Sequence, residues 1–355
     1  MKTNVSSLGQ GPGLAWKRGS SSFPPGSLAE LEEWTGGATE PPEPPWHGDV
    51  TFQQWNTIGW GITDDGVLCI KPWEGDTGET GSVTTGNDIP WNDKVSKIKK
   101  VESTGTIVLN ECSTGLFSGC SDLTDITGLA GWDVSNVTSM SFMFGGCSSL
   151  TDLAALANWN VSNVTDMDSM FSSCSSLTDL TGLKDWNVST VTYMDSMFSS
   201  CSSLTDLSAL ANWDVSSVTS MDSMFYDCSS LTDLTGIADW NVSNVENMDS
   251  MFYDCSSLTD LSGLRSWNMS NVYEMRDMFY YCSSLQRIGI PSIRNGGQKL
   301  VENADDAKLT TVLPSIISED GSMGPYTWDD LNTEMTTNLE AFLDGTVWIK
   351  AEEAA

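Results

Sequence analysis

One spacing, the interval from Cys120 to Cys147, recurs without a change of length through the middle of this 355-residue chain. Cysteine takes every 27th position over this stretch: Cys120, Cys147, Cys174, Cys201, Cys228, Cys255 and Cys282. Tryptophans from Trp132 to Trp267 and Met-Phe pairs from Met143-Phe144 to Met278-Phe279 keep the same period. A fixed period of this length is typical of a solenoid, in which each coil buries its apolar edge against the next coil. The sequence therefore predicts an elongated repeat protein, an architecture that favours binding over catalysis.

Each repeat contains two segments with different predicted structures. The spaced leucines of CSSLTDLTGL, such as Leu177 and Leu180, together with threonine, favour a short strand. Apolar residues at helical spacing follow a turn, in one repeat Val164, Met167 and Met170, and predict a short helix. A strand, a turn and a short helix in every coil are the leucine-rich-repeat plan. The predicted fold class is therefore an α/β solenoid, a leucine-rich-repeat-like stack of coils.

The segments around the repeats divide the chain into four regions. Residues 1–48 are rich in Gly, Ser and Pro, which predicts a flexible N-terminal arm and a Pro-rich linker. Residues 49–116 contain short β-like runs with an Asp-Gly hairpin signal, and we expect them to form an N-terminal β cap. The solenoid fills residues 117–290. Residues 291–355 are expected to form a C-terminal cap from a helix and a short strand.

The repeat strings CSSLTDL, WNVSNVTDMDSMF and MFYDCSSL resemble the BspA-like leucine-rich repeats of bacterial surface proteins, a family also described as DUF285. The resemblance covers roughly residues 58–349. Its motif is specific, since seven copies of Met-Phe-x-x-Cys, or the variant Leu116-Phe117-x-x-Cys120, agree. The resemblance implies a leucine-rich-repeat fold and the role of a surface adhesin. Repeats in the family are usually somewhat shorter than those of this chain, which implies a longer turn near the tryptophan here.

The charge balance excludes one class of partner. There are 16 basic and 48 acidic residues, a formal net charge of -32. Such a surface repels nucleic acid and anionic membranes, and it attracts cations or a basic partner.

No signal-peptide-like segment, apolar run of membrane-spanning length or hydrophobic C-terminal tail is visible in the sequence. These features favour display of the protein on a virion surface, as a phage tail or capsid adhesin. The alternatives are a bacterial cell-surface adhesin and a structural virion decoration protein without a ligand.

The cysteine pattern predicts reduced thiols rather than disulfides. Equivalent positions on successive coils point the same way, and a free cysteine packs as a small apolar residue. A ladder of buried thiols fits that geometry. Cys69 and Cys112 lie outside the ladder, and the sequence leaves open whether they pair.

Two series of aspartates also follow the repeat. The first contains Asp125, Asp152, Asp179, Asp206, Asp233 and Asp260, and the second contains Asp168, Asp195, Asp222 and Asp249. We interpret both as structural, the first on the outer strand face and the second in a first helical turn. The alternative is calcium bridging between coils, for which the weak candidate ligands are Asp152, Asp179, Asp206 and Asp233. No EF-hand or nonapeptide calcium motif is present, so no cofactor is expected.

Catalytic chemistry has little support in this sequence. The single histidine, His47, lies in the Pro-rich linker, so no paired-histidine metal site and no nucleophile–histidine set can form. No phosphate-binding glycine motif occurs. We therefore expect a protein that is not an enzyme.

A few aromatic residues break the regularity and are the candidate binding residues. The position after Met-Phe holds Gly145, Ser172 and Ser199 in early repeats and Tyr226, Tyr253 and Tyr280 in later ones. We expect an aromatic stripe there, with Tyr281 beside it and further rings from Tyr193 and Tyr273 on the helical side, as the binding surface for a protein or glycan on a cell surface. The alternative is that tyrosine merely covers the helix edge. In the N-terminal arm, Trp16, Trp34 and Trp46 are candidate anchors to a particle or assembly protein.

Overall fold

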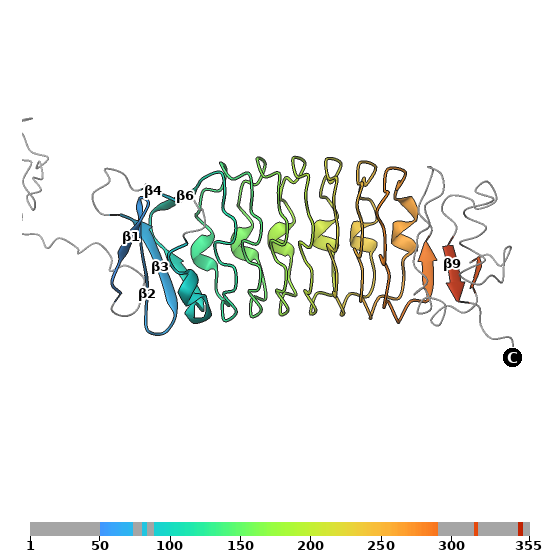
Figure 1. Cartoon of the computed structure of the whole chain (residues 1–355), viewed down its shortest axis with the longest axis horizontal. Helices are drawn as coiled ribbons and strands as arrows, with labels where there is room; N and C mark the ends of the chain where they lie inside the picture. The colour runs from blue at the N-terminus through green and yellow to red at the C-terminus, as the bar shows by residue number, and fades with distance from the viewer. Residues whose placement is uncertain (1–49, 74–79, 84–88, 290–315, 319–346, 351–355) are drawn as a thin grey trace, which may run out of the picture. The chain divides into compact units, whose positions relative to one another are not determined.

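A computed structural model describes residues 50–73, 80–83, 89–289, 316–318 and 347–350. The chain divides into two units, Met1–Trp46 and His47–Ala355, and all of the described residues belong to the second. Within that unit the repeats stack as successive coils, one coil for each repeat (Figure 1). The repeat solenoid predicted from the sequence is present. No helix in these ranges is long and apolar enough to cross a bilayer.

Two small sheets precede the coils. The first has the spatial order β1 (Gln53–Trp55), β2 (Ile58–Ile62), β3 (Val67–Pro72) and β5 (Lys100–Ser103). The second pairs β4 (Thr80–Val83) with β6 (Thr106–Leu109) in parallel. Both sheets lead into the repeats, since Lys100 forms a parallel bridge with Asp125 and Val108 forms one with Asp133.

The β2–β3 hairpin turns where the Asp-Gly signal predicts. Ile62 pairs with Leu68 across the antiparallel strands. Gly66 has a φ of +93°, and a Cβ atom there would lie 2.3 Å from the carbonyl oxygen of Lys97. Only glycine combines that left-handed backbone with so close an approach. The turn therefore depends on this one residue.

The junction with the first coil is built around Trp91, just before the 3₁₀ helix η1 (Asn92–Lys97). Its buried indole N–H donates to the carbonyl oxygen of Leu116 at 2.9 Å. Its ring stacks on Phe117 with centroids 6.3 Å apart. Phe117 begins the phenylalanine series of the core, so the chain before the repeats is packed onto the solenoid interior.

The prediction of a short helix in each coil is wrong. The described residues contain no α-helix. Around Met167 and Met170 the chain makes a tight turn, with the N–H of Met170 bonded to the carbonyl oxygen of Met167 at 3.2 Å. Ser169 has a φ of 54° and Ser173 one of 60°, and such left-handed residues interrupt a right-handed helix. A turn closed between residues three apart spaces apolar side chains as a helix does, which explains the error.

The predicted strand is also replaced, by a 3₁₀ turn. These turns are η2 (Thr127–Leu129), η3 (Ala154–Leu156), η4 (Thr181–Leu183), η5 (Ser208–Leu210), η6 (Thr235–Ile237) and η7 (Ser262–Ser266). Pairing between coils is reduced to single-residue parallel bridges. One series of bridges runs through Ser139, Asp166, Tyr193, Ser220, Asn247 and Glu274. The coil is thus a closed series of turns, and the leucine-rich-repeat likeness lies in its stacking rather than in its local structure.

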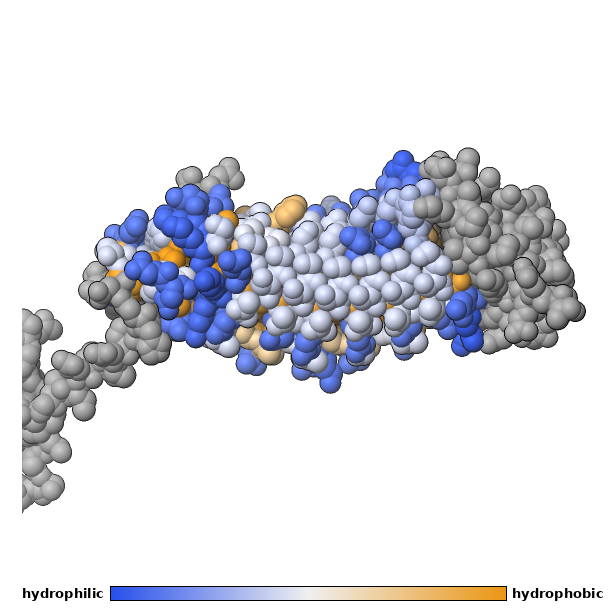
Figure 2. All heavy atoms as spheres, turned by 90° about the horizontal axis from the view of Figure 1, so that it is seen from below, coloured by the Kyte–Doolittle hydropathy of each residue, from blue (hydrophilic) through white to orange (hydrophobic). Residues whose placement is uncertain are grey.

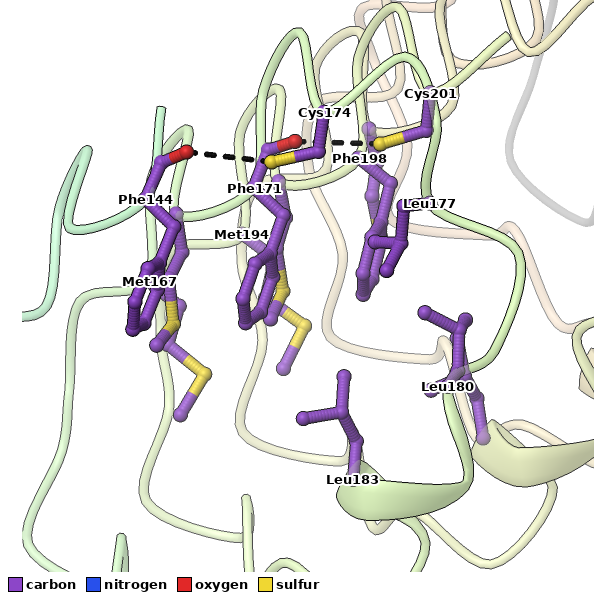
Figure 3. Packing of buried hydrophobic residues seen from close by; sticks show 14 of the residues in the cluster. Phe144, Met167, Phe171, Cys174, Leu177, Leu180, Leu183, Met194, Phe198 and Cys201 are labelled. Atoms are coloured by element: carbon purple, nitrogen blue, oxygen red, sulfur yellow. Dashed lines mark hydrogen bonds between the residues drawn. The ribbon is translucent and has the colours of Figure 1, made fainter. Parts of the chain in front are cut away.

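The core is a set of parallel side-chain ladders. Phe144, Phe171 and Phe198 stack face to face, with centroids 5.6 and 5.7 Å apart (Figure 3). Tryptophans form a second ladder beside the phenylalanines, with Phe144 and Trp159 6.4 Å apart between ring centroids, and the indole of Trp186 donates to the carbonyl oxygen of Leu156 at 3.0 Å. Each coil buries the same residue types, so every interior coil packs against near-identical neighbours.

The cysteine ladder is buried and reduced, as predicted. None of the nine cysteines forms a disulfide, so Cys69 and Cys112 are not bonded to each other. The thiol of Cys174 donates to the carbonyl oxygen of Phe144 at 3.2 Å, and Cys201 repeats the bond to Phe171 one coil later (Figure 3). From Cys147 onward, each ladder thiol therefore adds a hydrogen bond to a carbonyl of the preceding coil as well as filling space.

Beyond the last coil, β7 (Arg287–Gly289) and β8 (Ile316–Ser318) both pair in antiparallel fashion with β9 (Val347–Lys350). The short strand predicted near the C-terminus is therefore present. The helix predicted before it lies outside the described residues. Arg287 also bridges to Asp260, which connects this sheet to the final coil.

The thiols should be unreactive in the native protein. Burial raises the pKa of Cys120, Cys174 and Cys282 to about 12, so the reactive thiolate is scarce at neutral pH. We expect the half-buried Cys112 to react first with a maleimide and the seven ladder thiols to react only after denaturation. Mass spectrometry of labelled peptides measures both. Disulfides among the ladder cysteines, or their rapid labelling in the native protein, would contradict this structure.

Candidate functional site

Each coil turns outward for two residues between its buried phenylalanine and its buried cysteine. The first outward position holds Gly145, Ser172, Ser199, Tyr226, Tyr253 and Tyr280 in successive coils. The second holds Gly146, Ser173, Ser200, Asp227, Asp254 and Tyr281, all with positive φ between 54° and 78°. Asp and Ser tolerate this left-handed conformation at modest cost, and glycine adopts it freely.

Backbone hydrogen bonds hold these outward turns in register. The N–H of Ser200 donates to the carbonyl oxygen of Tyr226 at 2.6 Å. Asp227 makes the same bond to Tyr253, and Asp254 makes it to Tyr280, both at 2.7 Å. Side chains at equivalent positions are therefore fixed one directly beside the next along the stack.

The four tyrosines at the C-terminal end of this series come together, and we call Tyr226, Tyr253, Tyr280 and Tyr281 the tyrosine stack. The rings of Tyr226 and Tyr253 are 4.7 Å apart and 7° from parallel. Tyr253 and Tyr280 follow at 5.2 Å, and Tyr281 meets Tyr280 edge-on at 4.2 Å. All four residues are half-buried rather than exposed, because each ring covers part of its neighbour. The predicted stripe exists as a contact series, and its binding role stays a prediction.

Polar groups beside the tyrosine stack are without hydrogen-bond partners in the part of the chain that the structure describes. Within the described residues, the hydroxyls of Ser199 and Ser200 and the carboxylates of Asp227 and Asp254 make no hydrogen bond to another protein group. Burial, and then the Asp254 carboxylate, raise the pKa of Asp227. These groups are available to solvent or to a ligand.

The remaining candidate tyrosines lie elsewhere. Tyr193, 49% exposed, occupies the bridge series between Asp166 and Ser220. Tyr273 is 52% exposed and its hydroxyl donates to Glu246 at 3.2 Å. No ring contact joins either residue to the tyrosine stack in the part of the chain that the structure describes. Both residues occupy other positions on the coil than the tyrosine stack, and their role in binding stays a prediction.

Sequence reasoning missed one exposed aromatic residue, Phe142, which is 50% exposed. It has a φ of 56°, at a position where other coils carry Ser169 or Ser196. The signal was available, since an apolar residue replaces serine there in one repeat alone. Its backbone N–H donates to the carbonyl oxygen of Asp168 at 2.8 Å.

The first aspartate series begins the 3₁₀ turns. In each case the carboxylate accepts the backbone N–H two residues further on, as from Asp179 to Thr181 at 2.8 Å and from Asp233 to Thr235 at 3.0 Å. Asp152 and Asp206 do the same. These hydrogen bonds lower the pKa of Asp179. No group of three or more potential metal ligands lies together in the described ranges.

The second aspartate series links adjacent coils. Asp168 accepts the backbone N–H of Asp195 at 3.0 Å, and Asp195 accepts that of Asp222 at 2.9 Å. The expected stabilisation by the first turn of a helix does not occur, because the described chain forms a tight turn and no α-helix around these aspartates. Instead, burial and the carboxylates of Asp195 and Asp166 raise the pKa of Asp168 to about 6.

Basic residues stand at the ends of both aspartate series. Lys100 contacts Asp125 at 3.2 Å, and Arg287 contacts Asp260 at 3.3 Å. Arg276 occupies the coil position after Asp249 and donates to its carboxylate at 2.6 and 2.9 Å. Each row of like charges is thus closed by a cation at one end or at both.

The surface of the repeat region is polar yet sparsely charged over much of one face. Figure 2 shows rows of residues with hydropathy near the middle of the scale, and the most hydrophilic residues lie mainly toward the borders of that face. Serine and threonine at equivalent positions produce such rows.

The candidate anchors Trp16, Trp34 and Trp46 lie outside the described residues.

The comparisons with known proteins concern the repeats. The model of the family described as "Mycoplasma protein of unknown function, DUF285" matches residues 112–232 and 205–289, together half of the chain. One similar solved structure is a leucine rich cell surface protein from Faecalibacterium prausnitzii A2-165, at 13% identity and a TM-score of 0.17. That alignment covers 67% of this chain and 94% of the other. None of the curated proteins matches.

Replacing Asp168 by asparagine should stabilise the protein at about pH 7.5 but not at about pH 4. The folded-state pKa of about 6 exceeds the ordinary value of 3.8, so the folded chain binds the proton more tightly. Protonation of Asp168 therefore stabilises the folded chain. This contribution is fully present below pH 3.8 and is lost as the pH rises through about 6. Asparagine keeps an acceptor for the Asp195 N–H without the charge. Allowing for partial exposure, the gain is on the order of 1 kcal/mol.

Urea unfolding at several pH values measures this effect. The exposed Asp185, whose carboxylate makes no hydrogen bond within the described residues, provides the matched control. Its change to asparagine should leave the pH profile of stability unchanged. Equal effects of the Asp168 substitution at both ends of the pH range would show that its charge does not matter.

Proposed function

Because the chain belongs to the DUF285 family, we propose that it is a non-catalytic interaction protein displayed at a surface, where the tyrosine stack binds a partner on a cell. The family match agrees with the resemblance carried by the repeat strings. The proposal rests chiefly on one contrast. The first aspartate series and three members of the second, Asp168, Asp195 and Asp249, accept backbone N–H groups, whereas the polar side chains beside the tyrosine stack are left without protein partners among the described residues.

The distribution of the tyrosines supports this choice of surface. The core residues keep the same type in every interior coil, as the phenylalanine series shows. The first outward position instead changes from Gly145 through Ser172 and Ser199 to Tyr226. Packing of the core does not require that change. Tyrosine is favoured at binding surfaces because its ring is large, rigid and polar at one end.

A non-catalytic role agrees with the chemistry of the described residues. The one histidine of the chain, His47, precedes the first described residue, and within the described ranges no metal-ligand cluster is present. The carboxylate pairs between coils, such as Asp168 and Asp195, are engaged in backbone hydrogen bonds. Those carboxylates therefore serve to hold adjacent coils together.

The carrier that displays the protein is proposed to be a cell envelope, in line with the resemblance to bacterial surface proteins. Display on a virion is the alternative. Antibody labelling of intact cells and of purified particles distinguishes the two carriers. Labelling of particles alone would show that the carrier is a virion and not a cell envelope.

Changing Tyr226, Tyr253 and Tyr280 to serine should abolish most of the attachment to target cells. Serine is the natural residue at this position in the coil of Ser172, so the backbone turn is preserved. Loss of clustered aromatic contacts should weaken binding by about 2–4 kcal/mol in total. The melting temperature should fall by several degrees, since two stacked pairs are lost and each contributes about 0.5–1.5 kcal/mol.

Flow cytometry with the fluorescently labelled protein measures attachment, and circular dichroism confirms the fold. The variant in which the exposed Tyr193 becomes serine is the matched control, because Ser220 stands at that position one coil later. Attachment by the triple variant equal to that of the unaltered protein would move the binding surface away from the tyrosine stack.

Removing residues 1–48 should leave the solenoid folded and prevent its incorporation into the carrier. This segment holds Trp16, Trp34 and Trp46, whose apolar rings can dock on a partner protein. Co-sedimentation of the truncated chain with the carrier measures incorporation. Normal incorporation together with a normal melting curve would exclude an anchoring role for the three tryptophans.

A further inference from the structure

Tyr226 is the N-terminal end of the tyrosine stack, and within the described residues a neighbouring ring covers only one of its faces. Tyr253 covers one face at 4.7 Å. The opposite face points toward the preceding coil, where the same position holds Ser199. A serine side chain is too short to cover a phenol ring. The stack therefore ends in a step, with an aromatic wall above a floor of small polar residues.

The floor of this step carries groups that can both donate and accept hydrogen bonds. Ser199 and Ser200 lie directly before the ring, and Ser172 and Ser173 lie one coil further away. Their four hydroxyls make no hydrogen bond to other protein groups within the described residues. The Asp227 carboxylate, next to Tyr226 in the chain, adds an acceptor that is equally without a protein donor there.

We propose that this step, formed by the open face of Tyr226, the serine floor and Asp227, is a binding site for a neutral or amino-sugar-containing glycan. The proposal rests on the proposed function and names the class of its partner. The apolar face of a pyranose ring presents polarised C–H groups, which the negative face of an aromatic ring attracts. Its hydroxyls pair with serine, and two neighbouring hydroxyls can donate to one carboxylate.

The geometry disfavours the other kinds of occupant. An extended peptide that adds to a sheet edge needs free backbone donors and acceptors. Here the N–H groups of Ser173, Ser200 and Asp227 are all bonded to carbonyl oxygens of the next coil. An anionic polymer is repelled by the net charge of -32 and by Asp227 itself. A glycan without acidic groups meets neither obstacle.

Calorimetric titration of the full chain tests the site. The probes are hexasaccharides of β-1,4-linked N-acetylglucosamine, β-1,4-linked glucose and α-1,4-linked glucose, with a heparin hexasaccharide as the anionic control. We expect saturable binding of at least one neutral probe and none of heparin. The triple change of Tyr226, Tyr253 and Tyr280 to serine should weaken that binding at least about tenfold. Asp227→Asn should weaken it by about three- to tenfold.

A shifted stack provides a sharper test of the step itself. Ser199→Tyr adds a ring in front of Tyr226 and moves the open face one coil back, above Ser172. Binding should persist in this variant. Asp227→Asn should then have no further effect, because Asp227 is one coil away from the new open face. A full effect of Asp227→Asn in that background would overturn the assignment of the Tyr226 face.

Failure of this inference can be told apart from failure of the proposed function. Absence of saturable binding by all three neutral probes, or unchanged binding by the triple tyrosine variant, overturns the glycan site. If the triple variant nevertheless loses its attachment to cells, the tyrosine stack binds a protein and the proposed function stands. Unchanged attachment to cells would overturn the proposed function as well. The Tyr193→Ser control should retain the affinity of the unaltered chain in every assay.

Discussion

Backbone hydrogen bonds between equivalent segments of adjacent coils are the interaction on which this structure depends. The N–H of Phe144 bonds to the carbonyl oxygen of Met170 at 2.9 Å, and Phe171 and Phe198 repeat the same bond further along. Such a series forms only when successive repeats keep the same length and path. Because each repeat contains few residues of regular secondary structure, little else fixes the backbone. The side-chain ladders of the core follow from this register.

The same register has an electrostatic cost at the surface. Any carboxylate that occurs in every repeat is placed beside its own copies. The protein offsets the cost in two ways, by giving most of these carboxylates a backbone donor, as Asp179 has in Thr181, and by placing Arg276 after Asp249. Asp227 and Asp254 accept no hydrogen bond within the described residues, and burial and the Asp254 carboxylate raise the pKa of Asp227. Those residues are the ones that border the tyrosine stack.

The sequence was a good guide to whatever the repeat itself determines. Equivalent residues must lie side by side, so the phenylalanine, cysteine and tyrosine contacts could be derived from spacing alone. The conformation inside one coil could not. Ser169 and Ser173 adopt left-handed backbone angles that serine does not favour, so its presence does not predict them. The resulting turns space apolar side chains as a helix does. For the same reason, the sequence could not show which polar side chains are engaged with the backbone and which are free.

The cations that close the aspartate series have a consequence for the length of the molecule. Lys100, Arg276 and Arg287 meet the charges of the outermost coils, while the interior coils contact only copies of themselves. One whole interior repeat can therefore be gained or lost by unequal recombination without exposing an unmatched face. The ends would remain closed by the same three residues. Gain of a tyrosine-bearing repeat would also lengthen the aromatic surface, so the reach of the protein and the size of its contact area can evolve together.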